Sequence, residues 1–273
     1  MKSRFYPIYL CLLIPLSSCV REVTRISYMN LEAPAANQVI RITEEKKPGD
    51  LEFHSFFKYA NTTETTTPVP GVDQLPDSEL HWLMPRWQAG VDLDFAASGR
   101  TSFTGSFSYS EMSYGSVINP TFGVAISRSD SISATRFDFT LYVNSFNYDA
   151  VLFRQTTQGN DVIDTEFLDV SGSSTRVNPS FMFTFNMRQP RMPIFLNVGF
   201  GWQTLYDLDI ARSSDFYADD ISFRSGYTSV AAGLYGSTGK NSRIVFGARL
   251  TGYSIGELRP VTSLFLQFDF SLR

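Results

Sequence analysis

The chain has 273 residues and a formal net charge of −4, because 27 acidic residues slightly outnumber 23 basic ones. A mildly acidic chain with few basic clusters is a poor match for a phosphate backbone, so we expect no nucleic-acid partner. Only two cysteines and two histidines occur, which leaves little for thiol or imidazole catalysis.

The first segment predicts export from the cytoplasm. Lys2 and Arg4 precede a short apolar stretch, Phe5–Leu16, which has the layout of a secretory signal peptide and is too short to span a bilayer. It ends in the sequence LSSC, which resembles the bacterial lipobox. The resemblance implies that residues 1–18 are removed and that Cys19 is the lipidated N-terminus, with ordinary signal cleavage nearby as the alternative.

Residues 19–50 lack a convincing period, and they contain a charged run, Glu44–Lys47, followed by Pro48 and Gly49. We interpret them as a periplasmic tether or N-terminal segment. The sequence leaves open whether this segment is disordered or plugs the structure that follows.

From about residue 51 to residue 273 the chain alternates with a period of two. In one segment Phe181, Phe183 and Phe185 alternate with Met182 and Thr184, which is strand periodicity. Most such segments are about ten residues long, as a tilted strand needs to cross a hydrocarbon layer. The expected strands are 51–60, 86–96, 100–111, 120–128, 132–145, 179–188, 193–203, 225–236, 243–253 and 261–273.

The connections between these segments are alternately short and long, as in outer-membrane barrels with tight periplasmic turns and longer external loops. The longest expected loops are 61–85, 146–178 and 204–224. With ten strands, this alternation predicts that both termini lie on the periplasmic side.

These patterns predict an all-β fold, an antiparallel up-and-down transmembrane β-barrel of about ten strands over residues 51–273. The chain resembles small bacterial outer-membrane barrels, which implies a bacterial outer-membrane location. The implied partners are outer-membrane lipid, lipopolysaccharide, and the barrel-assembly and lipoprotein-export machinery. The alternative is a soluble, lipid-tethered β-sandwich that serves as a binding module.

The polar face of each strand is expected to point into the lumen, because carboxylates cannot face hydrocarbon. Oppositely charged groups in a narrow interior pair and fill it more readily than they form an open path. The expected luminal cluster is Asp92, Asp94, Arg136, Asp138, Arg188, Arg249 and Asp269. The expected aromatic girdle at the lipid head groups is Trp87, Tyr109 and Trp202.

Catalysis is not expected. Outer-membrane proteases of the omptin family are also ten-stranded, but they need an Asp-His pair near the end of the chain, and no histidine follows His81. His54 and Ser55 would point to opposite faces of a strand, and we interpret His81, beside Ser78 and Glu79, as a loop-packing residue. We also expect no cofactor and no metal site, because no known metal-binding spacing occurs.

The sequence therefore predicts a non-enzymatic outer-membrane β-barrel lipoprotein with a filled lumen and a structural or interaction role, its loop 146–178 facing outward. A narrow channel for small solutes is the second hypothesis. An enzyme acting on lipid through His81 is the third.

Overall fold

The computed structural model describes residues 20–34, 38–60, 64–68, 78–112, 115–158, 161–188, 193–208, 221–254 and 260–272. Among these residues no helix is long and apolar enough to cross a membrane. The described strands are β1 (Val20–Glu32), β2 (Leu51–Ala60), β3 (Glu64–Pro68), β4 (Glu79–Leu83), β5 (Trp87–Ala96), β6 (Thr101–Met112), β7 (Gly115–Ser129), β8 (Ser133–Gln158), β9 (Asp161–Met187), β10 (Ile194–Leu208), β11 (Ile221–Ser237), β12 (Ser242–Tyr253) and β13 (Val261–Leu272).

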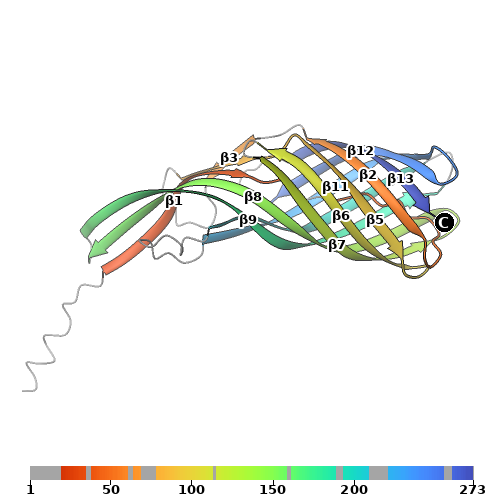
Figure 1. Ribbon diagram of the computed structural model, residues 1–273, viewed down its shortest axis with the longest axis horizontal. Coiled ribbons are helices and arrows are strands. Elements are labelled where there is room, and N and C mark those ends of the chain that lie inside the picture. The colour runs from red at the N-terminus through yellow and green to blue at the C-terminus, as the bar shows by residue number, and fades with distance from the viewer. Residues whose placement is uncertain are drawn as a thin grey trace, which may run out of the picture.

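Ten strands close into an antiparallel barrel in the order β8-β7-β6-β5-β2-β13-β12-β11-β10-β9, and β9 pairs with β8 to complete the ring (Figure 1). The first and last barrel strands are joined, with Leu51 opposite Leu272. The prediction of a ten-stranded up-and-down barrel is confirmed. The β-sandwich alternative is wrong, because a closed ring leaves no second sheet to pack against.

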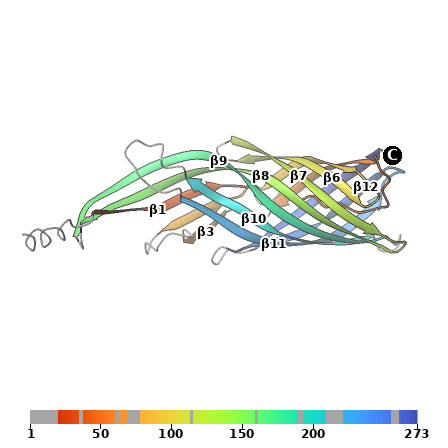
Figure 2. The ribbon, with the colours of Figure 1, turned by 90° about the horizontal axis from the view of Figure 1, so that it is seen from below.

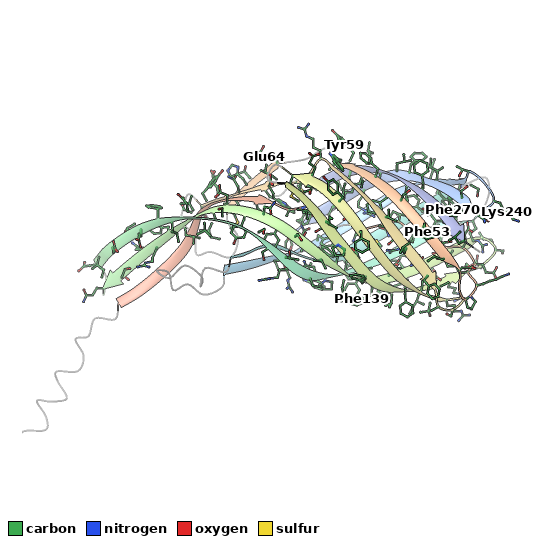
Figure 3. The ribbon with its side chains drawn as sticks, viewed as in Figure 1. Phe53, Tyr59, Glu64, Phe139, Lys240 and Phe270 are labelled. Atoms are coloured by element: carbon green, nitrogen blue, oxygen red, sulfur yellow. The ribbon has the colours of Figure 1, made fainter. Side chains whose placement is uncertain are left out.

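Alternation along the strands gives the wall two chemically different faces. On β2 the even-numbered positions Glu52, His54 and Lys58 are buried, while Phe57 and Tyr59 on the other face are exposed. Figure 3 shows Phe53, Phe139 and Phe270 on the barrel wall and Lys240 at the end of the barrel near the C-terminus. The outward face is thus an apolar, aromatic band and the inward face is polar, as period-two alternation requires.

Two strands continue far beyond the barrel. β8 has 26 residues and β9 has 27, and β9 pairs with β10 only over Ser180–Asn186. The remainder of this hairpin projects past the barrel mouth (Figure 2), where β1 pairs with β8, and β4 pairs with β1. We call the assembly of β1, β3, β4 and the outer parts of β8 and β9 the extension.

The expectation of an irregular loop at 146–178 was wrong. Val143–Gln158 is paired, through one register shift, with Asp161–Val177. Both faces of most of β9 in this stretch are exposed. A strand that is solvated on both faces carries no one-sided apolar pattern, so the β9 half of the stretch looks like a loop in the sequence.

Residues 38–50, which we call the luminal segment, pass through the inside of the barrel. Ile40, Arg41, Ile42 and Thr43 are all buried. At the end of the barrel that carries the short turns, the segment leads into β2 through Gly49, whose φ of 93° favours glycine. The segment therefore occupies the lumen, which a tether would not.

The expectation that both termini lie on one side was also wrong for the described part of the chain. Val20, where β1 begins, pairs with Gln158 at the tip of the extension, whereas Leu272 lies at the opposite end of the barrel (Figure 1). The physical reason is that the luminal segment adds one passage through the barrel that a count of strands omits. Cys19 and the expected signal peptide lie outside the described residues.

The mouth of the barrel below the extension is apolar. Trp82 of β4 packs edge-on against Tyr253 of β12, with ring centroids 4.6 Å apart, and its indole N–H donates to the Ala33 carbonyl at 3.1 Å. We call this group the mouth cluster. Its fully or nearly fully buried members include Ile26, Met29, Leu31, Leu80, Trp82, Phe146 and Leu152.

Candidate functional site: the charged lumen

Arg41 of the luminal segment joins two strands of the wall. Its guanidinium binds Asp92 of β5 through two hydrogen bonds, Nη2–Oδ1 at 2.5 Å and Nε–Oδ2 at 2.9 Å, and it donates from Nη1 to Asp138 of β8 at 3.0 Å. All three side chains are buried. Because two-point arginine–carboxylate contacts are strong and directional, Arg41 fixes the segment against two strands that β6 and β7 separate in the wall.

A second cation of the segment, Lys46, binds closer to the short turns, in the part that we call the lower lumen. Its ammonium lies 2.7 Å from Asp94 Oδ2 and 2.8 Å from Glu52 Oε2. Asp94 also accepts from Arg136 Nη1 at 2.5 Å, and Arg136 in turn binds Asp138. Arg41, Lys46 and Arg136 are thus parts of one continuous network of buried ion pairs.

The network continues through a histidine and a third arginine. His54 Nδ1 lies 2.9 Å from Asp269 Oδ1, and Arg243 Nε lies 2.9 Å from Asp269 Oδ2. Arg243 also reaches Glu44 of the luminal segment at 2.7 Å. Segment and wall therefore meet again on the far side of the lumen, at β12 and β13.

Within the described residues, the wall contributes more buried negative than positive charge to this network. Its buried carboxylates are Glu52, Asp92, Asp94, Asp138 and Asp269, and its two arginines are Arg136 and Arg243. Arg41 and Lys46 come from the segment. Because an unpaired buried charge is far more costly than a paired one, the carboxylates of this network depend on Arg41 and Lys46 for part of their charge balance.

Nearer the mouth the segment is held mainly by neutral groups. The Gln38 amide oxygen accepts from Ser229 at 2.5 Å, and the Gln38 backbone carbonyl accepts from Arg249 at 2.5 Å. A Cβ on Gly199 would lie 2.4 Å from the Gln38 side-chain nitrogen. Glycine at this position therefore allows the segment to approach the wall closely.

The structure brings Asp92, Asp94, Arg136, Asp138 and Asp269 of the expected cluster into one network. Arg249 also points inward, but its hydrogen-bond partners among the described residues are the Gln38 backbone carbonyl and the Asn197 amide oxygen.

Arg188 does not belong to the luminal cluster, so its assignment there was wrong. β9 ends at Met187, one residue earlier, and the Arg188 guanidinium donates instead to the Asp130 carbonyl at 2.6 Å. The Asp130 carboxylate caps the same turn by accepting from the backbone N–H groups of Ser133 and Ile132, and these two hydrogen bonds lower the pKa of Asp130.

Sequence reasoning missed six members of the network, one of which is Glu44 of the luminal segment. Glu52, His54 and Arg243 lie on the inward faces of expected strands, so the alternation already pointed to them. Arg41 and Lys46 fall in the stretch interpreted as a tether, where no periodic signal marks them.

The three expected girdle residues lie on the wall toward the mouth. Trp87 begins β5, and Tyr109 of β6 lies beside it with ring centroids 5.6 Å apart. Trp202 on β10 is 44% exposed and contacts Phe181.

Each of the two histidines lies within hydrogen-bond distance of a carboxylate. His54 is enclosed by carboxylates. His81 lies on β4, with Nε2 at 3.2 Å from Glu79 and its ring against Tyr28.

No protein-family model matches this chain, and no curated protein matches its sequence. Several solved structures of outer-membrane β-barrels are similar in fold. The outer-membrane protease OmpT from Escherichia coli is 8% identical, with 82% of this chain and 94% of that chain covered at a TM-score of 0.39. The KdgM porin in complex with disordered oligogalacturonate is 8% identical. The match covers 82% of this chain and 99% of that chain, with a TM-score of 0.34. The translocator domain of the autotransporter NalP from Neisseria meningitidis is 10% identical. The match covers 83% of this chain and 90% of that chain, with a TM-score of 0.34.

Proposed function

We propose that this chain is a non-enzymatic bacterial outer-membrane β-barrel that is sealed by its own luminal segment and carries an extension for contacts outside the membrane. One observation carries the proposal: Arg41 and Lys46 of the segment pair with four carboxylates that come from three different strands of the wall. Such a lumen is built to hold the segment in place. The mouth cluster adds an apolar barrier above it.

The wall supports a membrane location. Its ten strands are antiparallel and even in number, as in bacterial outer-membrane barrels, and its outward face is apolar. An exposed aromatic band of this kind costs free energy in water and is stable in hydrocarbon.

We assign the short turns 97–100, 130–132 and 238–241 to the periplasmic side, because barrels of this class have tight periplasmic turns. The extension then lies outside the cell, together with β1. Under this orientation a lipid on Cys19 would anchor the chain from the external side.

Conductance tests the sealed lumen. We expect the wild-type barrel to give no stable ion current in a planar bilayer, because charged pairs fill the lower lumen and apolar side chains fill the mouth. A steady single-channel current from folded wild-type protein would contradict this and favour the narrow-channel alternative.

Labelling tests the orientation. A cysteine at Thr165, in the extension, should react with a membrane-impermeant maleimide in intact cells, whereas a cysteine at Lys240, in the β11–β12 turn, should react only after the outer membrane is opened. The unsubstituted chain serves as the blank. The reverse pattern would place the extension in the periplasm.

A further inference from the structure

Three side chains in the lower lumen have the donor set of a metal site. Glu52, His54 and Asp94 are buried, and one ligand atom from each lies within 4.8 Å of the others. Ligands of a tetrahedral zinc ion at ordinary bond lengths are about 3.4 Å apart, so small side-chain rotations would bring these atoms into position. Imidazole and carboxylate together suit divalent transition metals.

The orientation of His54 is also that of a metal ligand. Its Nδ1 is held by the Asp269 carboxylate at 2.9 Å, which is the usual outer contact of a metal-binding histidine. Its Nε2 is buried, has no hydrogen-bond partner among the described residues, and lies 3.9 Å from oxygens of Glu52 and Asp92. With Nδ1 protonated, the Nε2 lone pair faces two carboxylates, an arrangement that a cation would stabilise.

Lys46 supplies a cation at this position. Its ammonium contacts Glu52 and Asp94, which are two of the three potential ligands. A metal ion and the ammonium cannot occupy the same oxygens at once.

One member of the group borders a cavity at the end with the short turns. A cavity of about 40 Å³ is lined by Glu52 and Asp269 together with residues of the β11–β12 turn. Of the three potential ligands, Glu52 is the one that lines this cavity.

We propose that Glu52, His54 and Asp94 form a binding site for a divalent transition-metal ion, which competes with Lys46 for the same carboxylates. Metal binding then displaces the Lys46 ammonium from Glu52 and Asp94, while Arg41, Glu44 and the backbone at Gly49 still hold the segment against the wall. This goes beyond the sealed-barrel proposal, which concerns the protein without metal.

Cobalt titration of the purified, folded full chain tests the proposal, because Co²⁺ bound by nitrogen and oxygen ligands gives visible absorption bands. Lys46→Met should bind one equivalent at least about tenfold more tightly than the wild type, which should bind at millimolar Co²⁺. Lys47→Met, which removes the exposed lysine next to Lys46 in the same segment, should behave as the wild type. His54→Gln should abolish the bands in both the wild-type and the Lys46→Met backgrounds.

Two results would overturn the proposal. Folded Lys46→Met without the bands, or with bands that survive His54→Gln, would rule out the site. Equal affinity in the wild type and Lys46→Met would rule out the competition. Should Lys46→Met fail to fold, Lys46→Gln replaces it, and the loss of the wild-type bands in His54→Gln remains an independent test. Conductance of the metal-free wild type is measured separately, so the sealed-barrel proposal can fail without this one.

Discussion

Toward the short turns, the lumen is filled by charged side chains of residues 38–50 paired with the wall, whereas toward the extension it is closed by apolar side chains of β1 and β4. The two halves respond differently to change. Ion pairs in a buried site need both partners, and losing one leaves a charge stranded. Apolar packing loses free energy in proportion to the volume removed and tolerates swaps of similar size.

The largest effect is expected from breaking the charged half. Arg41→Ala should lower the free energy of unfolding by about 3–5 kcal/mol, because Asp92 loses both of its hydrogen bonds to the guanidinium. Urea unfolding of the barrel in lipid vesicles measures this. Adding Asp92→Asn to Arg41→Ala should restore part of the lost stability. A double variant less stable than Arg41→Ala alone would contradict the ion-pair explanation.

The apolar half should break locally. Trp82→Ala should cost about 3 kcal/mol, since it removes a fully buried indole and its hydrogen bond to Ala33. Limited proteolysis should then cut β1 while the barrel remains folded and sealed to ions. Trp82→Phe is the control and should cost under about 1.5 kcal/mol. An ion current through folded Trp82→Ala would show that the charged half does not seal the lumen by itself.

The junction of the two halves is sensitive to overpacking. Gly199→Leu should destabilise by about 1–3 kcal/mol, because its side chain would collide with Gln38 of the luminal segment. Gly236→Leu, where a Cβ meets nothing within 4 Å, is the matched control. Equal denaturation midpoints for the two variants would show that Gln38 is not held tightly.

A site outside both halves should matter least. Arg188→Ala should cost about 0.5–1 kcal/mol, since it removes one exposed hydrogen bond to the Asp130 carbonyl. Ion conductance should be unchanged. A new ion current in this variant would show that the Arg188 side chain belongs to the luminal network after all.

The wall could be predicted because each of its strands has an apolar outward face and a polar face toward the lumen. In β5 and β13 the alternation of large apolar and polar residues marks both the strand and its inward face, so Asp92, Asp94 and Asp269 could be assigned to the lumen from the sequence alone. The missed wall residues Glu52 and His54 lie on the inward face of β2, which the same alternation marks.

The luminal segment could not be predicted in this way. A chain inside a barrel touches wall on every side, so consecutive residues such as Ile40, Arg41 and Ile42 are all buried and no period appears. The strand β1 could not be predicted for another reason. Its pairing with β8 shifts register between Ile26 and Tyr28, which interrupts the period-two alternation.

The path of the luminal segment restricts the order in which the molecule can assemble. The paired strands β1 and β4 lie at one end of the lumen and the turn at Gly49 lies at the other, so the segment runs through the barrel and is held at both ends. A ring that closed first would have to admit an unfolded N-terminal strand through a bore already lined with side chains. We therefore expect the last pair of strands to close around residues 38–50, so that the charged inner faces of the wall assemble against the segment.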